Sequence, residues 1–250
     1  MLVRDYTDGK CGSLRIAGNY LTANYLIPVW AAALKQIHKN MTIKVTTNKT
    51  AAAVNELLNY QADAAVLGGG AIIHKNELCI KKIMTDELWF VAAPNHKYAN
   101  KIISLETIIS EPFILRENGS YNRFTLEALC HIHNLKAPKI ALEFDGLHES
   151  LMAAISGYGI VFCSSLTVHE FITAGKLSRI YVKDIDLINE IVLCTRKNEP
   201  YSPLLQNFFC CYAYDADICI IMEKGLYTKC WGKQKFKLTS ALFFCKKIRA

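Results

Sequence analysis

The residues best suited to binding a ligand lie in the corner sequence RENGS, which contains Arg116, Asn118, Gly119 and Ser120. This corner follows a short apolar run and precedes a segment with helical spacing. A guanidinium forms paired hydrogen bonds to a carboxylate or phosphate, and a helix N-terminus offers unpaired backbone N–H groups to the same anions. The corner therefore predicts one wall of an anion-binding cleft.

Two structural interpretations compete with ligand binding at this corner. Ser120 fits an N-cap, whose hydroxyl satisfies an N–H group of the following helix and needs no ligand. Arg116 could instead form an ion pair with Glu117 or Glu143, since such pairs are common at protein surfaces. We favour the ligand cleft because other corners of the sequence are predicted to face it.

Hydrophobic periodicity predicts two α/β units that position such corners. The expected strands are 13–18, 42–47 and 62–67 in the first unit, and 112–115, 139–144 and 159–163 in the second. Helical spacing separates these strands, and Pro28 suits the first turn of the helix expected at 24–39. A βαβαβ order is typical of a mostly parallel sheet, and the apolar run at 87–99 fits a crossover between the units. The expected fold class is α/β, with two Rossmann-like lobes joined by crossover strands.

Four polar corners end expected strands and begin expected helices. They are GNYLTAN (18–24), TNKT (47–50), RENGS (116–120) and DGLHES (145–150). In open α/β sheets, ligands bind outside the carboxyl ends of the strands, where helix N-termini carry a partial positive charge. Two facing lobes would form a cleft lined by these corners. His148 lies in the fourth corner and is the histidine we consider a candidate, whereas Asn48 and Thr50 fit a plain turn and cap equally well.

The net charge of +7 is concentrated near the C-terminus. Residues 214–250 carry eight basic and three acidic side chains, so the residues before them are nearly neutral. A nearly neutral domain is a poor binder of a nucleic acid backbone. We therefore expect no direct DNA contact from residues 1–213. The tail at 214–250 fits either a basic amphipathic element that touches nucleic acid or an unselected extension of the chain, and we favour the extension.

Several functional classes lack their signatures in this sequence. No apolar run reaches the roughly 18 residues that span a membrane, and the N-terminus lacks a secretory signal, so we expect a cytoplasmic protein without a membrane partner. No CxxC pair occurs, and reduced structural cysteines are expected at positions inside apolar runs. These are Cys79, Cys130, Cys163, Cys194 and Cys210. No GxSxG, HExxH or Cys–His constellation appears, so we expect no catalysis, no metal and no cofactor.

The order of these motifs resembles the effector-binding domain of LysR-type transcriptional regulators over about residues 12 to 213. That domain opens on motifs similar to GSLRIAGNYLTANYLIPVW and TTNKTAAAVNELLNYQADAAVLGG, and its crossover segment is similar to ELWFVAAPNHKYA. Its RE-x-GS-x-x-R corner is similar to FILRENGSYNRFTLEALC, its glycine-flanked strand to AISGYGIVFCSS, and its last helix to SPLLQNFFCCY. The joint order is more specific than any one motif.

The resemblance implies a type 2 periplasmic-binding-protein-like fold with a small anionic inducer between the lobes. It divides the chain into a residual linker at 1–11, a first lobe at 12–91 and 166–213, a second lobe at 92–165, and a tail at 214–250. It implies a homodimer that uses the helix at 24–39, although Trp30, Leu34 and Ile37 on that helix form a stripe typical of core. DNA binding would require an N-terminal winged helix-turn-helix that has no counterpart here. The alternatives are a transporter's solute-binding protein of the same fold, or a degenerate regulator without a ligand.

The resemblance also implies which residues contact the ligand. They are Asn19, Tyr20, Leu21, Asn48, Thr50, Arg116, Gly119 and Ser120, to which Asn118 and His148 are added from their places in the corners. Relatives usually have serine and threonine in the first corner, where this chain has Asn-Tyr-Leu and reaches Thr22 only afterwards. Leu21 cannot donate a side-chain hydrogen bond, so the first corner must use backbone N–H groups or accept an apolar part of the ligand.

Overall fold

The computed structural model describes residues 9, 11–70 and 72–215, with the backbone alone for 210–215. Contacts divide the chain after Tyr212, and the fold described here belongs to the first of the two units, Met1–Tyr212. Nearly all of the predicted linker and basic tail, and the side chain of Cys210, lie outside the described residues. None of the helices described is long and apolar enough to cross a membrane.

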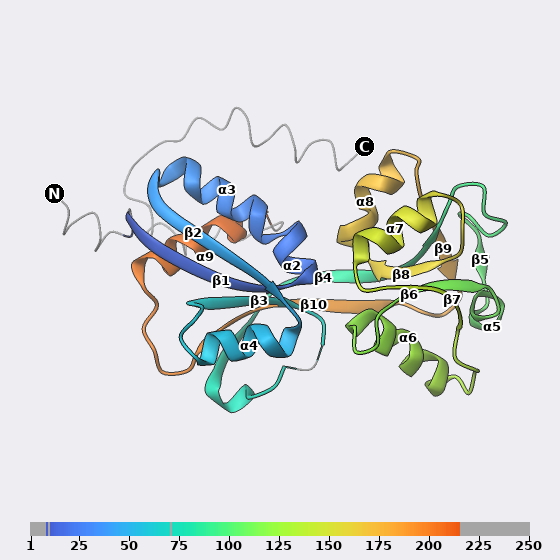
Figure 1. Cartoon of the computed structure of the whole chain (residues 1–250), viewed down its shortest axis with the longest axis horizontal. Helices are drawn as coiled ribbons and strands as arrows, with labels where there is room; N and C mark the ends of the chain where they lie inside the picture. The colour runs from blue at the N-terminus through green and yellow to red at the C-terminus, as the bar shows by residue number, and fades with distance from the viewer. Residues whose placement is uncertain (1–8, 10, 71, 216–250) are drawn as a thin grey trace. The chain divides into compact units, whose positions relative to one another are not determined.

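The first lobe is built around three parallel strands with helices on both faces (Figure 1). The strands are β1 (Cys11–Asn19), β2 (Asn40–Asn48) and β3 (Ala64–Gly68), and the helices are α2 (Tyr20–Tyr25), α3 (Ile27–Ile37), α4 (Thr50–Leu58) and α9 (Pro203–Asp215), with a short 3-10 turn η1 (Lys75–Glu77). Alternate residues of a strand point to opposite faces of its sheet. Leu14 and Ile16 of β1 accordingly pack with Trp30 of α3, whereas Ala17 packs with Val54 of α4.

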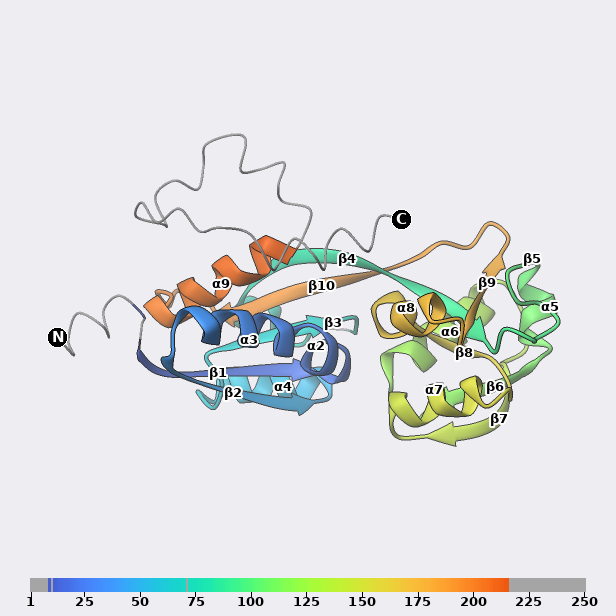
Figure 2. The ribbon, with the colours of Figure 1, turned by 90° about the horizontal axis from the view of Figure 1, so that it is seen from above.

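Two long strands cross between the lobes (Figure 2). They are β4 (Leu78–Ala92) and β10 (Leu187–Arg196). The two strands pair antiparallel, from Leu187 opposite Leu88 to Arg196 opposite Leu78. In the first lobe β10 also pairs with β3, and in the second lobe β4 pairs with two further strands. The main sheet therefore has the order β2-β1-β3-β10-β4-β9-β5, with β8 also on β4, and it connects the two lobes.

The second lobe repeats the α/β arrangement of the first. Its strands are β5 (Ile102–Ile103), β6 (Pro112–Arg116), β7 (Lys139–Phe144), β8 (Val161–Ser164) and β9 (Ser178–Val182), and its helices are α5 (Leu105–Ile109), α6 (Tyr121–Ile132), α7 (Leu147–Ile155) and α8 (Ser165–Thr173). Strands β6 and β7 are parallel, and Phe113 forms an isolated parallel bridge with Ile160 just before β8. Leu126 of α6 and Leu151 of α7 belong to two different apolar clusters of this lobe. The predicted α/β class with two lobes is confirmed.

The boundary between the lobes lies at a different place in the chain from the one predicted. The sequence placed residues 166–213 in the first lobe, but Val168 and Leu177 pack with Val91 in a cluster of the second lobe. Ile180 of β9 pairs with Phe90 of β4 in the same lobe. The return to the first lobe therefore takes place within β10, because strand pairing keeps α8 and β9 on the second lobe.

The structure also corrects the helix expected at 24–39. Helix α2 begins at Tyr20, and a separate helix, α3, begins at Ile27 with Pro28 in its first turn. Trp30 and Leu34 are buried in the core, whereas Ile37 is 41% exposed. The stripe is therefore mainly core, and Ile37 belongs to the outer surface of the helix.

The cysteine prediction needs one correction. Cys79 is exposed, because it lies in a stretch of β4 where the four consecutive residues 79–82 are all exposed, whereas Cys130, Cys163 and Cys194 are buried free thiols. Burial raises the pKa of Cys163 to about 12 and that of Cys194 to about 12, so both remain protonated near neutral pH. These two buried thiols serve as small apolar side chains.

Candidate ligand-binding cleft

A cavity of about 430 Å³ lies where the parallel strands of both lobes end. Its lining residues are Asn19, Tyr20, Leu21, Lys49, Thr50, Ala51, Gly68, Gly70, Arg116, Glu117, Gly119, Ser120, Tyr121, Asn122, Phe124, Leu147 and Ser164. The lining includes the last residue of β1 and of β3 from the first lobe, and the last residue of β6 and of β8 from the second. This is the position at which open α/β sheets bind their ligands.

Five helices begin at the cavity wall. Helices α2, α4 and α6 follow Asn19, Lys49 and Ser120, while α7 begins with Leu147 and α8 follows Ser164. The first turn of a helix leaves its backbone N–H groups without partners inside the helix. In α6, the Ser120 hydroxyl accepts one of them, Arg123 N, at 3.3 Å. The remaining first-turn donors give the cavity a positive potential that suits an anion.

Asn19 joins the ends of two strands rather than pointing freely into the cavity. Its Nδ2 donates to the Gly68 carbonyl at 2.7 Å and to Thr50 Oγ1 at 3.3 Å. Its Oδ1 accepts from Thr22 N at 3.3 Å, which starts α2 immediately after β1. Asn19 is 7% exposed, so these bonds hold the first corner in one conformation.

Arg116 forms the ion pair that the sequence left as an alternative. Its Nε and Nη2 donate to the Glu117 carboxylate at 2.8 and 3.1 Å. Its guanidinium also lies over the ring of Tyr20, with 5.1 Å between Cζ and the ring centroid. Lys49 Nζ lies 3.8 Å from Glu117. Arg116 is only 8% exposed, so this partner on the adjacent residue compensates a largely buried charge.

A side chain of the second lobe packs against the Gly68–Gly70 run. Gly69 has a φ of +72°, and a Cβ at this position would lie 2.2 Å from ring atoms of Tyr121. The Tyr121 ring therefore lies directly on the Gly69 backbone, where only glycine leaves room. This contact joins the lobes beside the cavity, together with the contacts of Tyr20 with Arg116 and of Lys49 with Glu117.

Ser164 lines the cavity, and its hydroxyl is buried. It ends β8 and is 2% exposed. Within the part of the chain that the structure describes, its Oγ has no hydrogen-bond partner. Leaving a buried hydroxyl unpaired costs on the order of 1–3 kcal/mol.

The structure brings seven of the predicted residues together at the cavity and leaves three outside it. Asn19, Tyr20, Leu21, Thr50, Arg116, Gly119 and Ser120 line it. The side chain of Asn48 donates instead to Glu56 at 2.9 Å, and both Asn118 and His148 are exposed residues outside the lining.

Sequence reasoning missed several lining residues, notably Lys49, Glu117, Tyr121, Phe124 and Ser164. Lys49 and Glu117 belong to corners that the sequence singled out, but their charges were not assigned to the cavity. Ser164 could have been found with the rule that gave the other corners, because it also ends a parallel strand before a helix. Nothing local in the sequence indicates Tyr121, whose position depends on the approach of the second lobe to Gly69.

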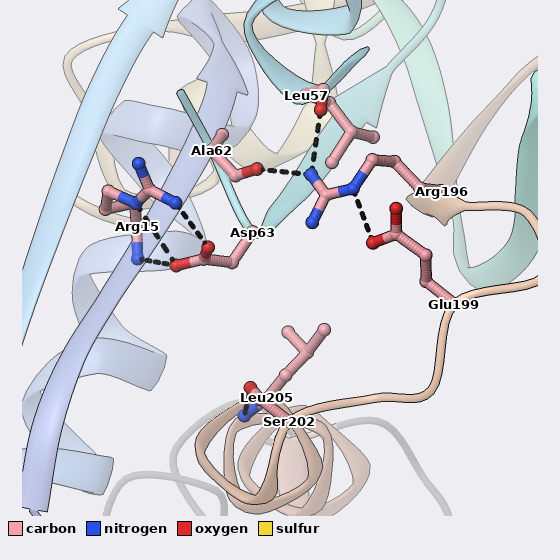
Figure 3. Close-up of polar contacts among 8 residues, drawn as sticks. All are labelled: Arg15, Leu57, Ala62, Asp63, Arg196, Glu199, Ser202 and Leu205. Carbon is pink, nitrogen blue, oxygen red and sulfur yellow. Dashed lines mark hydrogen bonds and ion pairs between the residues drawn. The ribbon is translucent and has the colours of Figure 1, made fainter. Parts of the chain in front are cut away.

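A second cavity, of about 80 Å³, is lined mainly by polar residues. Figure 3 shows that charged side chains in and beside this lining are paired with one another. On one side Arg15 Nη2 donates to Asp63 at 2.7 Å. On the other side Arg196 donates to Glu199 at 2.7 Å and to the carbonyls of Leu57 and Ala62, each at 2.8 Å. Arg196 thus satisfies the Leu57 carbonyl in the last turn of α4 and the Ala62 carbonyl just before β3, which is a structural role.

Comparison with known proteins agrees with this geometry. Residues 7–213 match the family model described as LysR substrate binding domain. A probable RuBisCO transcriptional regulator of Phaeodactylum tricornutum is 26% identical over 210 residues, covering 82% of this chain and 68% of the relative. The HTH-type transcriptional regulator YeiE of Escherichia coli is 26% identical over 171 residues, covering 68% of this chain and 57% of the relative. The chain thus spans roughly three fifths of the length of these relatives.

Solved structures support the fold independently. The regulatory domain of Synechocystis CcmR in complex with 2-PG has a TM-score of 0.74 at 20% identity, covering 83% of this chain and 99% of that one. The effector-binding domain of QuiR in complex with shikimate has a TM-score of 0.68 at 17% identity, covering 83% of this chain and 98% of that one. At this level of identity the likeness establishes the fold, and the predicted resemblance is confirmed by the family match.

Proposed function

The chain belongs to the LysR substrate binding domain family, and from this premise we propose that its cleft binds a small anionic metabolite as the inducer of a transcriptional regulator. One observation carries the proposal. The N-termini of α4 and α6, with the cations Lys49 and Arg116, meet around a cavity of about 430 Å³. Such a combination of helix N-termini and basic side chains favours carboxylate or phosphate.

The ligands of related structures agree with this choice. CcmR was solved with 2-PG and QuiR with shikimate, and shikimate carries a carboxylate. The curated relatives are described as transcriptional regulators rather than as transport proteins, which favours an inducer over a transported solute. For the same reason we propose a cytoplasmic site of action.

The proposed mechanism is a shift in the population of closed lobes. A ligand that touches the α4 corner of the first lobe and the α6 corner of the second binds the closed arrangement more tightly than an open one. Differential affinity of this kind is what moves a conformational equilibrium. In the whole regulator the shift would alter the geometry of a homodimer, and a winged helix-turn-helix would carry the change to DNA.

A thermal-shift screen with the purified chain tests the proposal. The panel should pair anionic metabolites, including aromatic carboxylates, acetylated amino acids and sugar phosphates, with neutral amide analogues. A ligand at 100 times its dissociation constant stabilises the native state by about 2.7 kcal/mol. We expect a saturable shift for an anion and none for its amide.

Variants of cavity residues test whether a ligand that shifts the melting temperature binds in this cavity. Arg116→Lys removes the planar donor fork and should weaken the shift, as should Lys49→Gln. Lys44→Gln is the matched control, because Lys44 is an exposed lysine of β2 that does not line the cavity. A folded protein that responds to no anion, or a response that survives Arg116→Lys unchanged, would contradict the proposal.

A further inference from the structure

Glu117 places a carboxylate inside the cavity, beside the arginine that an anionic ligand would use. Its Oε2 accepts Arg116 Nε at 2.8 Å, and its Oε1 accepts Arg116 Nη2 at 3.1 Å. The same Oε1 lies 3.8 Å from Lys49 Nζ, so this side chain faces both cations of the cleft. Its side chain is 14% exposed, which limits the screening of its charge by water and salt.

Arg116 has little freedom to turn towards another anion. Its guanidinium has five N–H donors in one plane, and Glu117 occupies one edge of that plane. Tyr20 covers the face of the guanidinium, with 5.1 Å between Cζ and the ring centroid. Among the described residues Glu117 is the acceptor given for this guanidinium, so the N–H groups of Nη1 and the second N–H group of Nη2 are the donors that remain for a ligand.

The neighbouring arginine does not add charge to the cavity. Arg123 Nε pairs with Glu127 at 2.9 Å, and its Nη1 pairs with Glu143 at 2.8 Å. Arg123 is also absent from the lining. The charged side chains among the described lining residues are therefore Lys49, Arg116 and Glu117.

We infer that Glu117 is a specificity-determining residue that restricts the cleft to ligands with a single negative charge. The inference rests on the proposed anion-binding function and names the ligand class for that cleft. Among the charged side chains, two cations and one fixed anion leave one positive charge for a ligand to balance, and the helix N-termini add only partial charges to it. A second ligand charge beside Arg116 would face the Glu117 carboxylate at short range, in a partly buried site where repulsion is strong.

The rest of the lining describes the uncharged part of this ligand. Tyr20, Leu21, Phe124 and Leu147 offer apolar surface. A monocarboxylate with an apolar or aromatic body complements these groups. Small polyanions do not, because they bring more charge and less apolar surface.

Calorimetric titration of the full chain with benzoate and with phthalate tests the inference, at a pH where both carboxyls of phthalate are ionised. The two probes share a ring, and phthalate adds a second carboxylate next to the first. We expect wild type to prefer benzoate. In Glu117→Gln the ratio of the two dissociation constants should shift towards phthalate by at least about tenfold, because the amide keeps an acceptor for Arg116 and removes the repelling charge.

Glu127→Gln is the matched control, since it also removes the carboxylate partner of an arginine but lies outside the cavity. It should leave the ratio unchanged. Lys49→Gln gives a second test that does not depend on the folding of Glu117→Gln, because the Lys49 side chain is 57% exposed. It should weaken phthalate more than benzoate.

Each result decides the inference. A ratio that Glu117→Gln leaves unchanged, an equal shift in Glu127→Gln, or equal losses in Lys49→Gln would overturn it. A folded Glu117→Gln variant that does not bind phthalate would overturn it as well. Benzoate binding that Arg116→Lys abolishes would still support the anionic-inducer function, so the two proposals fail separately.

Discussion

Ser120 caps helix α6, and this cap would be present in any ligand site at this corner. Its hydroxyl accepts Arg123 N at 3.3 Å and caps α6, and the residue is 8% exposed. The capping interpretation and the ligand interpretation are therefore compatible. Fixing the first turn of α6 also fixes the N–H groups that face the cavity.

Replacing Ser120 by alanine should separate these two effects. Loss of an N-cap destabilises a protein by about 1 kcal/mol, measurable by urea unfolding. Ser104→Ala is the matched control, because Ser104 caps α5 through Thr107 N, also at 3.3 Å, on a helix away from the cavity. Both variants should lose similar stability, but Ser120→Ala alone should weaken the binding of an anion found in the thermal-shift screen. Equal affinities in the two variants would argue that Ser120 is only a cap.

At the scale of elements, the sequence predicts what local patterns determine and misses what distant contacts determine. The order of strands and helices follows from periodicity, and Pro28 is in the first turn of a helix as predicted. The start of α2 was missed because Asn19 and Thr22 are held by the carbonyls of Gly68 and Val66, more than forty residues away. The lobe boundary was missed for a similar reason, since β9 is placed by its pairing with β4.

The approach of α6 to the exit of β3 gives a second prediction. Gly69→Ala would place a Cβ 2.2 Å from the Tyr121 ring, at a φ of +72°. Gly175→Ala is the matched control, because its φ is +68° and nothing lies within 4 Å of the added Cβ. Both variants should lose about 1–2 kcal/mol from the left-handed backbone, as measured by urea unfolding. Gly69→Ala should lose more stability and also bind anions more weakly, since Tyr121 or its whole lobe must move. Identical losses in the two variants would show that the lobes do not depend on this contact.

At the scale of the whole molecule, the two crossing strands β4 and β10 join the lobes. Asp86 of β4 is 4% exposed and accepts from Ser165 Oγ at 2.6 Å and from Asn189 Nδ2 at 3.2 Å. It thereby ties β4 to β10 and to the start of α8, whose N-cap Ser164 lines the cavity. These polar contacts link the cavity wall to the two strands that join the lobes.

The proposed homodimer would use α3 as its interface. The outer face of this helix provides the last prediction. Val29 is 56% exposed and Ile37 is 41% exposed, although Trp30 and Leu34 of the same helix are buried. Val29→Asp should dissociate the proposed dimer, because a carboxylate buried in an apolar interface has no partner there. Light scattering after size exclusion would measure the mass.

Ile188→Asp is the matched control for this prediction, since Ile188 is a similar aliphatic residue, 64% exposed, on β10. It should leave the mass unchanged. A monomeric wild type would contradict the dimer itself. A Val29→Asp variant with the mass of the wild-type dimer would place the interface elsewhere, and lobe closure would then have to reach the partner through a surface other than α3.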